Sequence, residues 1–180
     1  MSFTFRNILH AKDLQVLEKL MKTTGLFYDF EIAVALEVLG SFLERGEASG
    51  YHCIVAQQDR QCAGYAVFGP TPCTRSGWDI YWMAVRKDLQ GMGLGSQLIT
   101  IIEKEIVLQG GSHIWIETSG RQDYLPTRKF YEKHRYRIMA QLPDFYAPGD
   151  SKVIYGKQIS FFQTDNGQLK NSRLPISTER

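Results

Sequence analysis

The sequence predicts an α/β fold of the α+β type, in which about four helices flank a mixed, mostly antiparallel sheet of about six to seven strands. Strand-like and helix-like stretches follow one another in the order β α α β β β α β α β β. The central βαβ part requires a parallel crossover, whereas the short links on either side of it require antiparallel pairs. The length of 180 residues, with 43% hydrophobic and 22% charged residues, suits one globular domain.

The N-terminal half should contain one strand, two helices and a hairpin. Residues 3–8 alternate like a short strand, and two helices should span residues 13–22, capped by Asp13, and 29–45. Residues 52–69 are typical of two strands joined by a tight turn.

The register of this hairpin bears on the cysteines. With Asp59 and Arg60 at its tip, Cys53 should lie opposite Ala66, so no disulfide with Cys62 is implied. The odd number of three cysteines, without CxxC spacing, indicates free thiols in a reducing cytoplasm.

The C-terminal half should supply the parallel crossover and a second hairpin. The segment WDIYWMAV is apolar on both faces apart from Asp79, as expected of a central strand. An amphipathic helix follows from Leu94, then the strand HIWIE and a short helix at 126–134. The segments YRIMAQL and KVIYGKQI should be the last strands, joined by the loop PDFYAPGDS. We expect 152–159 to be an edge strand that could pair across a homodimer.

The domain should cover residues 1–160, and residues 161–180 are polar and expected to be a mobile tail. A net charge of +2 gives no electrostatic reason to expect nucleic acid or an anionic membrane as partner. No apolar run approaches the roughly 20 residues of a membrane span. The His and Cys spacings do not resemble a metal site.

A turn with three alternating glycines, in Gln90-Gly91-Met92-Gly93-Leu94-Gly95, leads from the central strand into a helix. Such a helix N-terminus leaves backbone N–H groups free for a pyrophosphate. A P-loop would need Lys-Ser/Thr after its last glycine, and here Ser96 and Gln97 follow. A dinucleotide fold is disfavoured because RKDLQ separates Val85 from Gly91, although Glu117 lies where a ribose-binding acid would be sought.

The motif Gln-x-x-Gly-x-Gly, with its flanking strand and helix and the downstream FYEKHRYR, resembles the acetyl-CoA-binding loop of the GNAT N-acetyltransferases. The resemblance covers roughly residues 3–159 and implies the GNAT fold, with acetyl-CoA as cosubstrate. It implies an acetyltransferase in which a primary amine attacks the thioester directly in a ternary complex.

The resemblance also implies positions for the cofactor. The backbone of the glycine turn would bind the pyrophosphate, and the end of the preceding strand would pair with the pantetheine arm and polarise the thioester carbonyl. The turn residues are Gln90, Gly91, Met92, Gly93, Leu94, Gly95 and Ser96. The strand residues are Met83, Ala84 and Val85.

Two side chains are the predicted catalytic groups. Tyr131 matches the family's general acid, which protonates the leaving thiolate, and Glu117 could take the proton of the amine directly or through water. Tyr124 stands where the family often has a cofactor-binding asparagine, so we do not transfer that contact. Arg135 stands where the family usually has a glycine.

The acceptor pocket of such enzymes is built by the first two helices and the link between the last strands. Tyr28, Asp29 and Tyr146 there would suit an amine, with ring faces adding cation–π attraction. A small amine or amino acid and a peptide N-terminus remain equally open as acceptors. Two other classes stay open: a non-catalytic acyl-CoA sensor of the same fold, and a nicotinamide- or flavin-dependent oxidoreductase.

Overall fold

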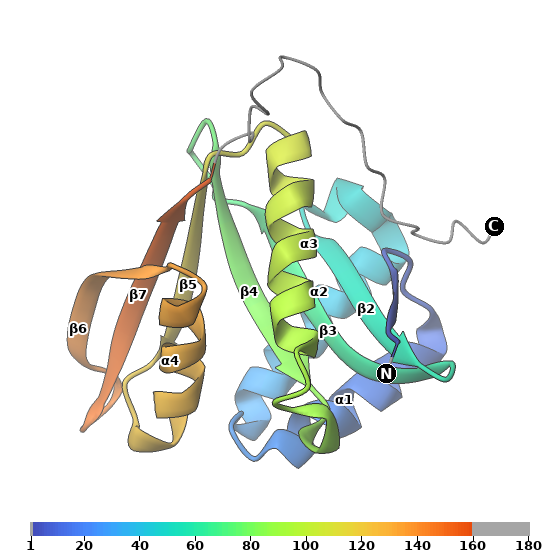
Figure 1. Ribbon diagram of the computed structural model, residues 1–180, viewed down its shortest axis with the longest axis horizontal. Helices are drawn as coiled ribbons and strands as arrows, with labels where there is room; N and C mark the ends of the chain where they lie inside the picture. The colour runs from blue at the N-terminus through green and yellow to red at the C-terminus, as the bar shows by residue number, and fades with distance from the viewer. Residues whose placement is uncertain (1, 160–180) are drawn as a thin grey trace.

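The computed structural model of the chain describes residues 2–159 (Figure 1). Its helices are α1 (Ala11–Thr24), α2 (Asp29–Arg45), α3 (Leu94–Leu108) and α4 (Leu125–Lys133). Its strands are β1 (Thr4–Arg6), β2 (His52–Gln58), β3 (Gln61–Pro70), β4 (Gly77–Val85), β5 (His113–Ser119), β6 (Arg137–Ala147) and β7 (Asp150–Gln158). The element order is the predicted one, and the predicted tail 161–180 lies outside the described residues.

The seven strands form one sheet in the order β1-β2-β3-β4-β5-β7-β6. Every neighbouring pair is antiparallel except β4 and β5, which are parallel and joined by α3. The sheet is therefore mixed and mostly antiparallel, as predicted.

The helices cover the sheet from both sides. Figure 1 shows α3 and α4 on the near face and α1 and α2 behind the sheet. Each face has its own apolar core: Leu98 and Ile102 of α3 pack against Ile116 of β5, whereas Leu17 of α1 and Leu39 of α2 pack against the opposite face.

Helix α1 begins earlier than predicted. Its N-cap is His10, and Asp13 lies in the first turn, where its carboxylate accepts the His10 backbone N–H at 2.7 Å. The same carboxylate makes a buried ion pair with Arg6 of β1 at 2.8 Å. The prediction of Asp13 as the N-cap is wrong, because an Asp side chain also stabilises a helix from the third helical position. There it accepts a hydrogen bond from the backbone N–H of the N-cap residue.

The hairpin β2–β3 has the predicted tip, at which Asp59 and Arg60 both adopt positive φ angles of 50° and 64°. Its register is shifted by an irregularity between Ala56 and Gln57, so Cys53 faces Val67 and not Ala66. Cys53, Cys62 and Cys73 are all free thiols.

The predicted loop between the last two strands is wrong in extent. Strand β6 continues to Ala147, and β7 begins at Asp150. Between the pairs Leu142–Lys152 and Ala147–Asp150, β6 advances by five positions and β7 by only two, so a large bulge takes up most of the predicted loop. The predicted dimer edge is also wrong, because β7 lies inside the sheet between β5 and β6.

Candidate active site

The two parallel strands at the centre of the sheet separate halfway along their length. Their pairing ends at Ile80 and Ile116, beyond which β4 pairs with β3 alone. The separation coincides with a bulge in β4: Val67 and Phe68 of β3 face Trp82 and Ile80, which leaves Tyr81 as an extra residue. The backbone edge of Met83, Ala84 and Val85 on the β5 side is thereby left open to a strand-like ligand.

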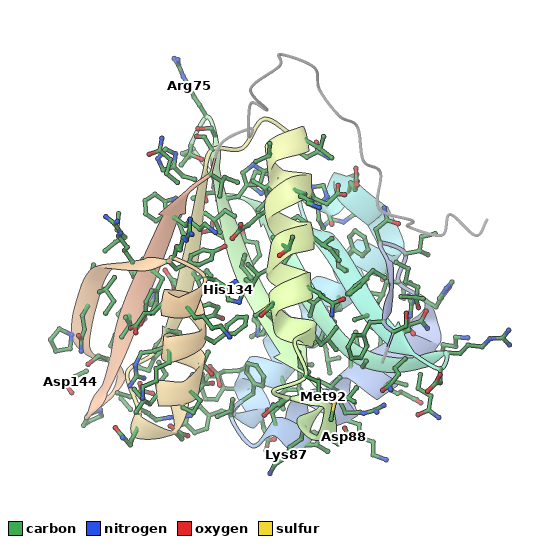
Figure 2. All side chains as sticks on the ribbon, viewed as in Figure 1. Arg75, Lys87, Asp88, Met92, His134 and Asp144 are labelled. Carbon is green, nitrogen blue, oxygen red and sulfur yellow. The ribbon has the colours of Figure 1, made fainter. Side chains whose placement is uncertain are left out.

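The glycine turn lies at the end of this open edge, where β4 leads into α3. Gly91 and Gly93 have φ angles of 79° and 86°, which side chains rarely adopt, and Gly93 is the N-cap of α3. Figure 2 shows Lys87, Asp88 and Met92 around this end of α3. Two of the three glycines are therefore required by the backbone itself.

The N-terminus of α3 offers unused donors. Within residues 2–159, the N–H groups of Leu94, Gly95 and Ser96 donate to no acceptor, and the first turn carries no acidic side chain. Two other N–H groups of the turn are engaged internally: Gln90 donates to Lys87 and Met92 to Leu89, at 3.4 and 3.3 Å. Free N–H groups and the partial positive charge of a helix N-terminus suit a pyrophosphate.

The third glycine serves packing. A Cβ on Gly95 would lie 3.2 Å from the Phe130 ring of α4, so glycine lets α3 and α4 approach closely. Next to it, the Ser96 hydroxyl lies 2.9 Å from Nε2 of His134, the residue that ends α4. Burial lowers the pKa of His134, which favours a neutral ring at this position.

Tyr131 of α4 is buried among aromatic rings on the α3 face of the sheet. Its ring centroid lies 5.6 Å from that of Phe130, 5.8 Å from Tyr155 and 6.1 Å from Tyr136. Burial, with a smaller contribution from Tyr155, raises the pKa of Tyr131 above its usual value of 10.0. The phenol therefore keeps its proton at neutral pH, as a general acid must.

The hydroxyl of Tyr131 differs from those of its neighbours. Tyr136 donates to Glu103 at 3.0 Å and Tyr155 to Glu132 at 2.9 Å. Among the described residues, the Tyr131 hydroxyl has no hydrogen-bond partner. It is nevertheless not fully enclosed: in residues 2–159 the fully buried side-chain polar atom without a partner is Thr71 Oγ1. The Tyr131 hydroxyl is thus available to an incoming group.

The two departures from the family pattern have structural explanations. Tyr124 turns its hydroxyl away to the Leu26 carbonyl at 3.0 Å, so it ties α4 to the α1–α2 junction. Arg135 adopts a φ of 66°, the left-handed conformation that glycine would adopt freely. The turn is kept without the glycine.

Glu117 is the first residue of β5 beyond the separation from β4 on the face that carries Trp115. Its carboxylate is about half exposed, and its Oε2 lies 2.6 Å from Nζ of Lys152 in β7. That ammonium lies 3.7 Å from the centre of the Phe145 ring and 5.7 Å from that of Tyr146. Sequence reasoning missed Lys152, because its pairing with Glu117 depends on the β5–β7 register.

The predicted acceptor residues come from two separate places. Tyr28 is the N-cap of α2, stacks on Phe30 at 5.4 Å and lies under the Arg121 guanidinium at 4.5 Å. Asp29 is the first residue of α2, and no cap hydrogen bond comes from it; Glu31 instead accepts the Tyr28 backbone N–H at 2.8 Å.

Tyr146 lies in the bulge of β6. Burial and the nearby carboxylates of Glu117, Glu31 and Asp150 raise its pKa to about 12. The structure thus brings Tyr146, Glu117 and the start of α2 into one electrostatic neighbourhood. Glu31 was missed because its helix-capping position gave no functional signal.

Asp79 is the acidic residue of the otherwise apolar strand β4, and the structure places it close to Glu117. It pairs with Trp115, two residues before Glu117 on β5. Burial is the main cause that raises the pKa of its half-buried carboxyl, Glu117 raises it further, and the nearby Thr71 side chain lowers it. Several carboxylates therefore lie close together at this end of the sheet, which would suit an ammonium group.

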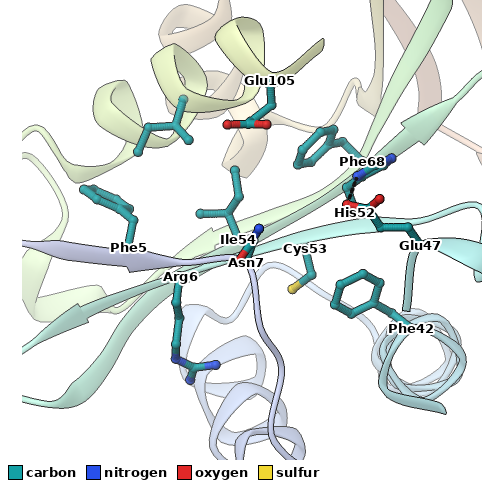
Figure 3. A pocket seen from close by; sticks show the side chains of 11 residues that line it. Phe5, Arg6, Asn7, Phe42, Glu47, His52, Cys53, Ile54, Phe68 and Glu105 are labelled. Carbon is teal, nitrogen blue, oxygen red and sulfur yellow. Dashed lines mark ion pairs between the residues drawn. The ribbon is translucent and has the colours of Figure 1, made fainter. Parts of the chain in front are cut away.

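A small cavity lies away from this neighbourhood. The cavity has a volume of about 30 Å³ and lies between β1, β2, α2 and α3. His52 and Glu47, in its lining (Figure 3), lie 3.4 Å apart. Its volume suits about one water molecule. In residues 2–159 no group of three His, Cys, Asp or Glu side chains could hold a metal ion, and none of the described helices is long and apolar enough to span a membrane.

Comparisons with known proteins agree with this geometry. A family profile described as "Acetyltransferase (GNAT) domain" matches residues 49–138. A crystal structure from Desulfovibrio desulfuricans, described as an acetyltransferase of the GNAT family, is 38% identical, with a TM-score of 0.84 over 87% of this chain and 99% of that one. A search of curated proteins found no match.

Two more distant structures share the fold. The ribosomal-protein-S18-alanine N-acetyltransferase of Escherichia coli is 18% identical, with a TM-score of 0.69 over 92% of this chain and 98% of that one. An aminoglycoside 6'-N-acetyltransferase complexed with coenzyme A is 17% identical, with a TM-score of 0.69 over 88% and 97%.

Proposed function

Since this chain belongs to the GNAT family of acetyltransferases, we propose that it moves the acetyl group of acetyl-CoA to a primary amine by direct attack in a ternary complex. One observation carries the proposal. The open edge of β4 ends in a turn whose glycines are required by their φ angles and whose helix has free N–H groups. Such an arrangement binds an extended chain and a pyrophosphate in sequence.

The protein's backbone supplies binding and polarisation. The free N–H groups of Leu94, Gly95 and Ser96 hold the pyrophosphate, and the unpaired edge at Met83 to Val85 holds the pantetheine arm. A backbone N–H on that edge stabilises the negative charge that develops on the thioester oxygen. Acetyl-CoA, when bound, supplies the activated acetyl group.

Two side chains move the protons. Glu117, half exposed at the end of β5, accepts a proton from the acceptor's ammonium, directly or through water. Tyr131, whose raised pKa keeps it protonated, donates a proton to the leaving sulfur. The two residues lie on opposite faces of the sheet at the place where β4 and β5 separate. This arrangement suits the reaction, because the amine near Glu117 and the sulfur near Tyr131 are on opposite sides of the acetyl carbon.

The acceptor is an amine that reaches the acidic end lined by Tyr28, Asp29 and Tyr146. A small amine or amino acid and a peptide N-terminus both satisfy this chemistry. The Escherichia coli relative that acts on a ribosomal protein and the aminoglycoside enzyme share the fold at 18% and 17% identity, so neither decides the acceptor.

The first test is calorimetric titration with acetyl-CoA, with NADH as the control. Binding of acetyl-CoA alone is expected, whereas binding of NADH alone would favour the oxidoreductase alternative. Release of CoA is then measured with a panel of small amines, amino acids and peptides. Acetyl-CoA binding without turnover of any amine would favour a sensor over an enzyme.

A further inference from the structure

One amine of the chain already occupies the place where the acceptor is expected. Lys152 Nζ lies 2.6 Å from Glu117 Oε2 and 3.7 Å from the centre of the Phe145 ring. The Lys152 side chain is 13% exposed, although a lysine would ordinarily extend its ammonium into water. A carboxylate and aromatic faces are the groups that an acceptor ammonium would use.

The strand register explains why this amine reaches the site. Lys152 faces Ser119 across the β5–β7 pair, so it lies diagonally next to Glu117 on the same face of the sheet. Glu117 in turn is the first residue on that face after β4 and β5 separate. The Lys152 ammonium is therefore held, through Glu117, next to the point where β4 and β5 separate.

On the basis of the proposed acetyl transfer, we propose that Lys152 is an intramolecular acceptor: the protein acetylates its own Lys152. Glu117 takes one proton from the Lys152 ammonium, and the free amine attacks the acetyl carbon. The N–C bond forms, the nitrogen loses its second proton to solvent, and the C–S bond breaks while Tyr131 protonates the sulfur and is reprotonated from solvent. Glu117 then releases its proton to solvent. The products are N-acetyl-Lys152, CoA with a free thiol and one proton.

The chain contains a matched control on the same strand. Lys157 Nζ lies 2.6 Å from Glu103 Oε1 and 5.2 Å from the centre of the Tyr136 ring, and its side chain is 19% exposed. Its surroundings thus resemble those of Lys152, but it lies on the opposite face of the sheet, beside α3. Spontaneous chemical acetylation should treat the two lysines alike, whereas catalysis at the site should select Lys152.

The experiment incubates the full-length protein with acetyl-CoA that carries a carbon-13-labelled acetyl group, followed by mass spectrometry of its peptides over time. We expect label at Lys152 to appear at least about tenfold faster than at Lys157, because the amine is held next to its base. The rate at Lys152 should not depend on protein concentration. Equal labelling of the two lysines would overturn the proposal.

Variants separate this proposal from the proposed function. Tyr131→Phe should slow labelling of Lys152 and leave Lys157 unchanged. The Lys152→Arg protein should carry no label at position 152 but should still bind acetyl-CoA. The Lys157→Arg protein should acquire label at Lys152 at the wild-type rate. An unlabelled Lys152 in a protein that acetylates external amines would overturn self-acetylation alone. If the wild-type protein does not bind acetyl-CoA, both the proposed function and self-acetylation are overturned.

A mixing experiment tests whether the step occurs within one chain. The Lys152→Arg protein, which keeps Tyr131 and Glu117, is mixed with the Tyr131→Phe protein, which keeps Lys152. We expect labelling of Lys152 in the mixture to remain at the slow rate of the Tyr131→Phe protein alone. Faster labelling would show transfer between chains and contradict the intramolecular route.

Discussion

The proposed cofactor end and the proposed acceptor end of the site are built in different ways. The cofactor end is one continuous segment, from Met83 to Ser96, and it acts mainly through its backbone. The acceptor end combines the start of α2, the end of β5 and the bulge of β6, and it acts through side chains. A site made of backbone groups depends little on the side chains outside its glycines, whereas the specificity of a site made of side chains depends on their identity. The fold can therefore keep one donor while its acceptors vary.

The largest expected effect is on the proton transfer that joins the two ends. Tyr131→Phe should lower kcat by about a hundredfold or more and leave the Kd for acetyl-CoA within about twofold, because a general acid acts only in the transition state. Steady-state kinetics and calorimetry measure the two quantities. Tyr155→Phe, in the same aromatic cluster, is the control and should keep most of the activity. Unchanged kcat in the Tyr131 variant would remove this residue from the mechanism.

Acetyl-CoA binding should depend on the backbone conformation of the glycine turn. Gly93→Val should weaken acetyl-CoA binding by at least about tenfold, since a β-branched residue strains the φ of 86° at the N-cap of α3. The control is Gly110→Val, which imposes the same strain at a φ of 81° beyond the other end of α3. Both variants should lose similar thermal stability, but only Gly93→Val should lose affinity in calorimetry. Equal affinities in the two would place the phosphates elsewhere.

The pH dependence should reflect the two ends separately. As pH rises, kcat/KM for an amine should increase by up to about tenfold per pH unit while the acceptor loses its proton. A raised pKa means that Tyr131 donates its proton at every pH below that pKa, so no loss of activity should follow from it below pH 10.0. A descending limb near pH 8 that disappears in Tyr131→Phe would contradict the raised pKa.

Substitutions at the proposed acceptor end should change the KM for the amine. Tyr146→Leu should raise KM for a cationic acceptor by about three- to tenfold, because it removes an aromatic face and keeps an apolar side chain. The Kd for acetyl-CoA should stay constant, which serves as the internal control. If KM for every amine tested is unchanged, Tyr146 does not line the acceptor pocket.

The smallest effect concerns a residue that belongs to neither end. Arg135→Gly should raise the free energy of unfolding by at most about 1 kcal/mol, since it relieves a left-handed conformation at φ 66° but adds unfolded-state freedom. Thermal unfolding measures the change, and kcat should be unaffected. A clear loss of stability would mean that the arginine side chain itself holds the turn.

The sequence by itself determined the element order, the mixed sheet and the glycine turn. These features depend on local patterns: apolar periodicity, residues that terminate helices, and φ angles that only glycine adopts easily. The exact starts of elements were less accessible, as Asp13 shows, because one side chain can stabilise a helix from more than one position. The start and end of α2, by contrast, agree with the prediction.

Only the tertiary structure decided how the acceptor end is assembled. The β6 bulge, the interior position of β7 and the Lys152–Glu117 pair depend on which strands become neighbours and in which register. A one-residue change of register would turn Lys152 to the other face of the sheet. Pairing between distant strands leaves no periodic signal in either segment, so the contact between Lys152 and Glu117 was found only once the sheet was known.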